Sequence, residues 1–260
     1  MAYLPGRKVG RRKKGRRGSA DKPPSRESEY LDIDLEKLKG AYGELEAAHR
    51  EVRESHIEMI FNLAIAAECK DADTGGHIVR ISDYATEVAK ALGLFEEEMD
   101  ALRYGSPMHD IGKIGIPDKI LQKPGKLNPE EWEIMKQHTV IGARIFQNSR
   151  SPILKAASEI ALCHHERFDG SGYPRALQGE SIPLFGRIVG MVDVFDAIVS
   201  KRCYKAASTF EEAVEYIRSQ AGTHLDPKLV KVFLKIEKKI RKIYDANTTI
   251  RHFVNDFEKF

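Results

Sequence analysis

The sequence predicts an all-α protein. Between residues 61 and 244, apolar residues recur at helical spacing almost without interruption. Runs of alternating Val, Ile and Thr, which would indicate half-buried strands, are nearly absent. Turn sequences such as Lys123-Pro124-Gly125 separate the helical stretches. The helices expected in this part cover residues 56–70, 76–93, 96–111, 129–148, 152–166, 186–201, 209–220 and 226–244.

The first 28 residues differ in composition from the rest of the chain. They are rich in Arg, Lys, Gly, Ser and Pro and show no apolar periodicity, so they cannot bury a core. Outside residues 1–17, 34 basic side chains are set against 39 acidic ones, so the globular part is mildly acidic. That balance argues against a nucleic-acid-binding face spread over the whole domain. We expect a disordered basic tail, either simply solvated or an electrostatic arm for anionic lipid or nucleic acid.

A helix with a heptad seam is predicted for residues 30–60. The seam residues alternate at spacings of four and three, with Glu, Lys and Arg elsewhere, although two histidines and two nearby glycines weaken the pattern. A parallel dimeric coiled coil and a single amphipathic helix packed on its own domain both fit this pattern. The seam consists of Leu35, Leu38, Tyr42, Leu45, His49, Val52, His56 and Met59.

The expected domain organisation has four parts. A disordered basic tail covers residues 1–28, and a helical linker covers 29–60. The globular domain covers 61–245, and a polar tail covers 246–260. No internal repeat is visible.

One helix start is marked by its local sequence. Asn128 is expected to cap the helix that follows, with Pro129 in the first turn and Glu131 completing a capping box. Trp132 and Met135 lie at helical spacing in that helix, and we interpret both as core residues.

Cysteine usage and hydropathy bear on the location of the chain. Cys69, Cys163 and Cys203 are scattered and form no CxxC pair, which argues against a disulfide framework and for a reducing compartment. No run of about 18 apolar residues is present, and no apolar segment follows the basic N-terminus as in a secretory signal. We therefore expect a cytoplasmic protein.

The pair His109-Asp110 is the first indication of a metal site. Neighbouring helix residues point about 100° apart, so both side chains reach one metal only at the end or edge of a helix. Gly112 would allow the backbone or a ligand to approach closely, and Lys113 would bring a point charge to a phosphate. An HD dipeptide by itself is weak support.

Side-by-side histidines strengthen this interpretation. His164 and His165, followed by Glu166, are hard to explain as core packing. Imidazole and carboxylate without thiolate suit Mn, Fe or similar divalent ions rather than structural zinc. Two metals about 3.5–4 Å apart, bridged by a carboxylate and a hydroxide, would hydrolyse a phosphodiester without a protein nucleophile. Consistently, the chain lacks a GxSxG elbow, a P-loop and a GxGxxG fingerprint.

At this point the residues match a known family. The chain resembles the HD-GYP domains, a branch of the HD-superfamily metal-dependent phosphohydrolases, in segments that follow in order from residue 71 to residue 205. These segments are Asp71–His77, His109–Lys113, Ile116–Leu121, Lys123–Leu127, Met135–His138, His164–Pro174, Asp193–Ala197 and Arg202–Lys205.

The resemblance implies a fold and a set of metal ligands. The fold would be an HD-type helical bundle with an N-terminal helical, coiled-coil extension, and the cofactors would be two or three divalent ions, Fe or Mn. The first ion would be held by His77, His109, Asp110 and Asp193, with Asp110 bridging to the second ion. The second ion would be held by His138, His164 and His165. A third would use Asp73, which is shorter than the Glu that the family has there.

Other residues resemble the family's substrate-binding groups. Lys113 would bind phosphate, and together with Asp110 it would be catalytic. Asp196 lies one turn beyond Asp193 and would support a metal ligand. Tyr173 of the signature loop offers a ring to stack on guanine and a hydroxyl to hydrogen-bond. The remaining groups are Arg187, Arg202 and Lys205, which would hold the dinucleotide, and the loop residues Asp169, Gly170, Gly172 and Pro174.

One departure from the family pattern is visible. The family usually has proline between the equivalents of Arg202 and Tyr204, whereas this chain has Cys203. Proline would fix φ near −65°. We expect this segment to be less rigid but no metal ligand to be lost.

The function implied by the resemblance is a cyclic di-GMP phosphodiesterase of bacterial signal transduction. A metal-bridging hydroxide would open cyclic di-GMP to linear pGpG and then to GMP. One alternative substrate is cyclic GMP-AMP or another nucleotide. A second alternative is a non-catalytic nucleotide-binding adaptor. Expected partners are a second copy through residues 30–60 and a diguanylate cyclase or response regulator.

Overall fold

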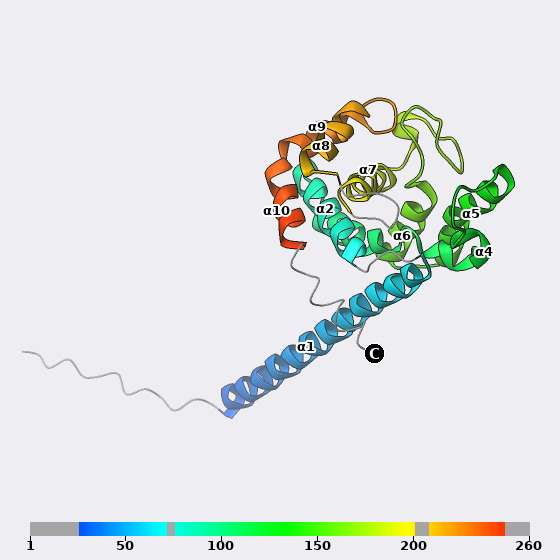
Figure 1. Cartoon of the computed structure of the whole chain (residues 1–260). Helices are drawn as coiled ribbons and strands as arrows, with labels where there is room; N and C mark the ends of the chain where they lie inside the picture. The colour runs from blue at the N-terminus through cyan, green and yellow to red at the C-terminus, as the bar shows by residue number, and fades with distance from the viewer. Residues whose placement is uncertain (1–25, 72–75, 201–207, 248–260) are drawn as a thin grey trace, which may run out of the picture. The chain divides into compact units, whose positions relative to one another are not determined.

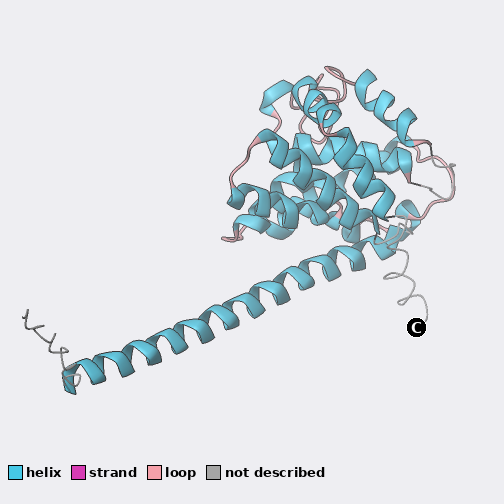
Figure 2. Ribbon diagram, turned by 90° about the vertical axis from the view of Figure 1, so that its left-hand side faces the viewer, coloured by secondary structure: helices cyan, strands magenta, loops and turns pink. Residues whose placement is uncertain are grey.

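The computed structural model describes residues 26–71, 76–200 and 208–247. Among them no strand occurs, and the only bridge between extended residues is the isolated pair Ala221–Leu225. The all-α prediction is therefore confirmed (Figures 1 and 2). The predicted basic tail and C-terminal tail lie almost wholly outside the described residues.

The chain divides into two units, Met1–Val52 and Arg53–Phe260. The helix α1, Arg26–Glu68, begins in the first and ends in the second, so the two helices expected at 30–60 and 56–70 are one. In the second unit its last turns bury Ala64 and Ala67.

The seam of α1 is open along the described residues. Leu38 is 66% exposed and Leu45 is 67% exposed. Tyr42, Val52 and Met59 are likewise exposed. These side chains are thus available to a partner.

The second unit is a bundle of helices around one main core. Figure 1 shows α7 running through the bundle, with α2 and α6 beside it. The largest fully buried side chains of this core include Tyr84 from α2 and Phe195 from α7, whose rings meet edge to face at 5.3 Å. The helices around the core are α2 (Gly76–Leu92), α3 (Glu96–Gly105), α6 (Pro152–Cys163), α7 (Leu184–Val199), α8 (Phe210–Ser219), α9 (Pro227–Lys235) and α10 (Glu237–Asn247).

Two further helices pack on the side of this bundle. They are α4, Asp118–Leu121, and α5, Pro129–Phe146, and α5 packs against α6. The start of α5 is capped as predicted, because Asn128 Oδ1 accepts from Glu131 N at 2.8 Å and Glu131 Oε2 accepts from Asn128 N at 2.9 Å.

Two predicted helices are wrong in extent. The helix expected at 96–111 ends at Gly105. A 3₁₀ turn, Ser106–Met108, follows, and Pro107 within it has no N–H to donate to a continuing helix. His109 and Asp110 follow, ahead of a second 3₁₀ turn, Ile111–Gly115. The helix expected at 226–244 is interrupted at Ile236, where α9 ends and α10 follows at a new angle.

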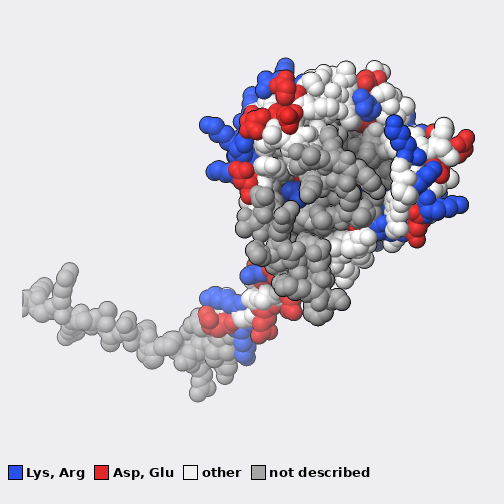
Figure 3. Space-filling model, in the orientation of Figure 1, with Lys and Arg blue, Asp and Glu red and all other residues white. Residues whose placement is uncertain are grey.

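The described surface is mixed in charge. On the face shown in Figure 3, acidic and basic side chains are interspersed over the described part of the chain. No helix in the described ranges combines the length and hydropathy needed to cross a bilayer.

Candidate metal centre

Seven predicted ligands lie in two adjoining clusters. Within each cluster the ligand atoms all lie within 4.8 Å of one another. They come from the start of α2, the turn after α3, the middle of α5, the end of α6 and the middle of α7. The histidine cluster is Asp110, His138, His164 and His165, and the mixed cluster is His77, His109 and Asp193.

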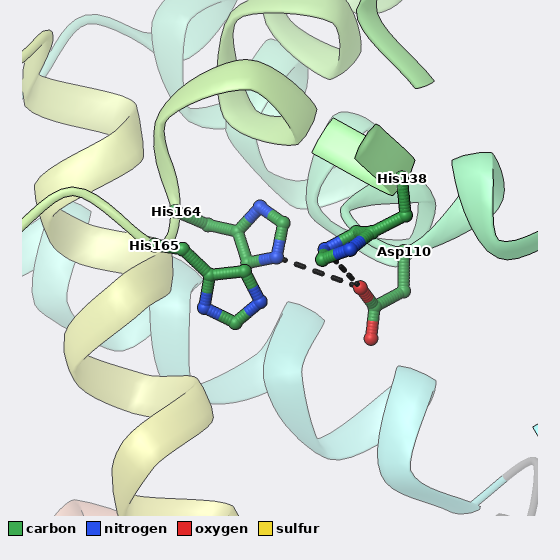
Figure 4. A group of neighbouring side chains, drawn as sticks. All are labelled: Asp110, His138, His164 and His165. Atoms are coloured by element: carbon green, nitrogen blue, oxygen red, sulfur yellow. Dashed lines mark ion pairs between the residues drawn. The ribbon is translucent and has the colours of Figure 1, made fainter. Parts of the chain in front are cut away.

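Asp110 faces both clusters. Its Oδ1 lies 3.3 Å from His138 Nε2 and 3.5 Å from His164 Nε2. Figure 4 marks both contacts with dashed lines. Its Oδ2 lies 3.4 Å from His109 Nε2 and 2.9 Å from Lys113 Nζ. One carboxylate oxygen on each side is the arrangement that a bridging ligand requires.

Three histidines are oriented by backbone carbonyls. His138 Nδ1 lies 2.7 Å from Met135 O, His109 Nδ1 lies 3.1 Å from Ser106 O, and His164 Nδ1 lies 3.1 Å from Ile160 O. A carbonyl can only accept, so each Nδ1 carries a proton and each Nε2 is the atom that offers a lone pair to the centre when the ring is neutral.

The donor set fits divalent metal ions. The Nε2 atoms of His109, His138 and His164 and Oδ1 of Asp110 are buried and have no hydrogen-bond partner among the described residues. Buried polar atoms in that condition are costly unless a ligand or ion meets them. Imidazole nitrogens with carboxylate oxygens are typical ligands of divalent transition metals.

His77 is oriented differently, by a buried carboxylate. Its Nδ1 lies 2.7 Å from Oδ2 of Asp196, whose side chain is fully buried. Arg80 donates to both oxygens of Asp196, at 2.6 and 2.8 Å, and Ser200 Oγ donates at 3.1 Å. Burial raises the pKa of Asp196, but Arg80 and His77 lower it to about 2. The supporting role expected for Asp196 agrees with these contacts.

The electrostatics of the two clusters are opposite. Burial lowers the pKa of His109, but the carboxylates of Asp110 and Asp193 outweigh it and raise that pKa to about 9. The pKa of His77 is also raised, because Asp196 and Asp193 outweigh burial. By contrast, burial lowers the pKa of His138 to about 4 despite the nearby Asp110.

The pKa values of His165 and Asp110 are both lowered well below their usual ranges. Burial and the neighbouring His164 lower the pKa of His165 well below its usual range. Burial raises the pKa of Asp110, but Lys113 and His109 hold it well below its usual range. Asp110 is therefore ionised, and His165 and His138 are neutral, which are the states that bind metal.

Sequence reasoning missed Glu68, the last residue of α1. Its side chain is only 7% exposed, and its Oε1 lies 3.9 Å from His77 Nε2. A single glutamate in a helix rich in charged residues gives no spacing signal. It brings a further carboxylate to the mixed cluster.

A glycine brings the clusters close together. A Cβ on Gly112 would lie 1.8 Å from His138 O and 2.5 Å from Gly142 N. Only glycine therefore lets the turn after Asp110 press against α5. The close approach expected at Gly112 is an approach of backbone to backbone.

Glu166 binds the backbone that directly follows the signature loop. This buried carboxylate accepts from Arg175 N at 2.8 Å and from Leu177 N at 2.9 Å. A Cβ on Gly172 would lie 2.3 Å from Arg167 N, so the loop also needs glycine there. The loop places the Tyr173 ring 4.8 Å from the His165 ring, and burial raises the pKa of Tyr173.

Other predicted residues lie elsewhere. Arg187 donates to Ile182 O at 2.8 Å and pairs with Asp226 at 2.5 Å, so its described contacts join the segment before α7 to the start of α9. Trp132 is 44% exposed, so its assignment to the core is wrong. Met135 packs on a small buried cluster around Ile116, as expected. The predicted residues Asp73, Arg202, Cys203 and Lys205 lie outside the described residues.

Comparison with known proteins identifies the family of the chain. Residues 57–229 match the HD domain family. A cyclic di-GMP phosphodiesterase of Thermotoga maritima is 45% identical over 219 residues, which cover 83% of this chain and 60% of that protein. A 3'3'-cGAMP-specific phosphodiesterase of Vibrio cholerae is 45% identical over 185 residues, covering 71% and 35%.

A solved structure supports the fold. The crystal structure of a cyclic GMP-AMP-specific phosphodiesterase of Vibrio cholerae matches with a TM-score of 0.59 and 22% identity, over 76% of this chain and 52% of that one. The chain thus spans roughly a third to three fifths of the length of the curated relatives named above.

Proposed function

The chain belongs to the HD domain family, and we propose that it is a metal-dependent phosphodiesterase that opens cyclic di-GMP to linear pGpG and then to GMP. The observation that carries this proposal is Asp110, which presents one carboxylate oxygen to each of two histidine-containing clusters. The 45% identity to a relative named for this activity supports it.

Divalent ions, Fe or Mn, would be held by the histidine cluster and the mixed cluster, with Asp110 shared. When bound, they would lower the pKa of a water and stabilise the charge on the phosphate and the leaving oxygen. Asp73 would contribute to a third ion.

The chain's own residues would position the substrate. Lys113 Nζ lies 2.9 Å from Asp110 Oδ2 and would bring positive charge to the phosphate beside the clusters. The backbone-bonded His138 and His164 hold their Nε2 atoms fixed, so little reorganisation is needed. Tyr173 borders the same site and would contact a base, with Arg202 and Lys205 holding the dinucleotide.

Cyclic GMP-AMP as the substrate is a second hypothesis with support of its own. The Vibrio cholerae relative named for 3'3'-cGAMP is as similar, at 45% identity, as the Thermotoga maritima relative. Hydrolysis of cyclic GMP-AMP would use the same metal chemistry with a different base pocket. A non-catalytic adaptor is less well supported, because seven candidate ligands are brought together.

The experiment is product chromatography after incubation of the anaerobically purified, Fe- or Mn-loaded protein with each cyclic dinucleotide. We expect cyclic di-GMP to be converted fastest, to pGpG. Faster conversion of cyclic GMP-AMP would favour the second substrate, and intact dinucleotides throughout would overturn the proposal. His109→Ala should abolish turnover, whereas His56→Ala, an exposed histidine of α1, should not.

We also propose that the seam of α1 pairs two copies of the chain, because its apolar side chains are exposed. Sedimentation analysis should give a dimer, and the double change Leu38→Lys and Leu45→Lys should give a monomer. An unchanged mass would contradict this pairing. A cytoplasmic location and a diguanylate-cyclase or response-regulator partner stay predictions.

A further inference from the structure

An exposed aromatic side chain adjoins the metal centre. Trp132 is the single tryptophan of the chain and lies on α5, six residues before His138. Its ring lies 5.8 Å from the ring of Tyr173, at 78°, so the two meet edge to face. Since Trp132 is 44% exposed, part of this residue is open to a ligand.

The Trp132 ring is the outer end of a row of rings that reaches the metal ligands. Tyr173 contacts Trp132 on one side and lies 4.8 Å from His165 and 6.3 Å from His138 on the other. His138 and His165 are part of the histidine cluster, where their rings are 5.1 Å apart. The row therefore runs from buried ligands outward to an exposed indole.

Core packing does not account for the indole. Met135, three residues later, packs against the buried cluster formed by Ile116, Ile120 and Leu121. Trp132 is absent from each of the buried hydrophobic clusters found in the described part of the chain. Its described ring contact is with Tyr173, at the edge of the site.

A cation lies beside the same surface. Lys136, one turn after Trp132 on α5, places Nζ 5.9 Å from the centre of the Tyr173 ring. It also pairs with Glu133 at 2.7 Å. A flat apolar surface with a cation at its edge suits a nucleotide, which joins an aromatic base to an anionic phosphate through one sugar.

We propose that Trp132, set against Tyr173, is a stacking surface for a nucleobase of the substrate whose phosphate lies at the metal centre. This rests on the proposed function. Stacking of a base on an aromatic side chain strengthens binding by roughly ten- to hundred-fold. The role is one of substrate binding, so it should act on KM far more than on kcat.

The single tryptophan allows a direct binding test. Cyclic di-GMP is titrated into the whole 260-residue chain, made metal-free with a chelator, while tryptophan fluorescence is recorded. We expect saturable quenching, produced also by GMP but not by ribose 5-phosphate, which lacks a base. An unchanged signal at saturating cyclic di-GMP, or equal quenching by ribose 5-phosphate, would overturn the proposal.

Kinetics of matched variants test the same point independently. Trp132→Ala should raise KM about ten-fold or more with kcat and metal content nearly unchanged, and Trp132→Phe should retain most of the affinity. Ile134→Ala is the control, because Ile134 is 41% exposed on α5 but points to another side of the helix. Equal effects of Trp132→Ala and Ile134→Ala, or a fall in kcat with loss of metal, would contradict a stacking role.

Failure of this proposal differs from failure of the proposed function. A wild-type protein that hydrolyses cyclic di-GMP with unchanged fluorescence and an unaffected Trp132→Ala variant would refute stacking alone. A loaded wild-type protein that leaves every cyclic dinucleotide intact would refute the function, while the titration would still report whether the base binds to Trp132.

Discussion

The two clusters of the candidate metal centre are adjacent, and backbone carbonyls orient histidines in both, but only the mixed cluster also depends on a buried carboxylate support. In the histidine cluster, His138 and His164 are oriented by carbonyls of their own helices. In the mixed cluster, His77 is oriented by Asp196, which is itself held by Arg80. The helical backbone is a support that side-chain substitutions leave intact, whereas the carboxylate support can be removed by one substitution.

Charge follows the same division. Burial governs the histidine cluster and lowers the pKa of His138, whereas carboxylates govern the mixed cluster and raise the pKa of His77 and His109. One cluster is therefore ready for metal at neutral pH, and the other must first lose protons. The difference teaches that one centre can combine two kinds of cluster. The histidine cluster is neutral and fixed in place, whereas metal binding to the mixed cluster requires loss of a proton.

The largest effect is expected at Asp110, the residue shared by the two clusters. Asp110→Asn should lower activity by roughly a thousand-fold or more and reduce the metal content of both clusters, because the bridging charge is lost. Metal analysis and turnover of the purified variant check this. Asp118→Asn removes an exposed carboxylate and serves as the control. Loss of metal from one cluster only would show that Asp110 is not shared.

Acid should separate the two halves. Below the His109 pKa of about 9, each pH unit should weaken metal binding in the mixed cluster by about ten-fold, because a proton must leave first. The His138 pKa of about 4 predicts little change in the histidine cluster between about pH 8 and pH 6. Metal content after dialysis at the two pH values measures this. Equal losses from both halves would contradict the division.

Removing the carboxylate support should affect one half alone. Asp196→Asn should weaken metal binding in the mixed cluster by roughly ten- to hundred-fold, because His77 loses its orienting acceptor. Metal titration of the variant should lose one ion and keep the other. Asp226→Asn breaks a comparable buried pair with Arg187 and is the control for general destabilisation. If both variants lose the same metal, Asp196 has no specific role.

The smallest effect is expected at Gly112, where the turn after Asp110 packs against the backbone of α5. Gly112→Ala places a methyl group against His138 O and should lower the free energy of unfolding by about 1–3 kcal/mol. Denaturant unfolding measures this loss. Gly43→Ala is the control, because a Cβ there meets nothing within 4 Å. A variant as stable as the wild type would mean that the turn and α5 move apart easily.

Sequence patterns predicted which side chains come together better than what supports them. The family motifs pointed to His77, His138 and the other candidate ligands that the described residues bring together. The carbonyls of Met135 and Ile160 leave no trace in residue identity, so the backbone support of the histidine cluster could not be predicted. Glu68 was missed for the same reason, since only folding brings the end of α1 beside His77.

The errors have physical causes. The helix expected to reach residue 111 ends at Gly105 because Pro107 follows, which frees His109 and Asp110 from helical geometry. Trp132 was assigned to the core because helical spacing does not reveal which face a neighbouring loop will cover. In the folded protein Trp132 is exposed and contacts Tyr173 of the signature loop instead of the core.

The most direct test of the two-half centre is activity measured against ions bound. Metal-free protein is loaded anaerobically in steps, and each sample is assayed for ions per chain and for conversion of cyclic di-GMP to pGpG. The account predicts that turnover stays low until the second ion binds, because the shared Asp110 acts between two occupied halves. Full turnover at one ion per chain, or none at any loading, would contradict it.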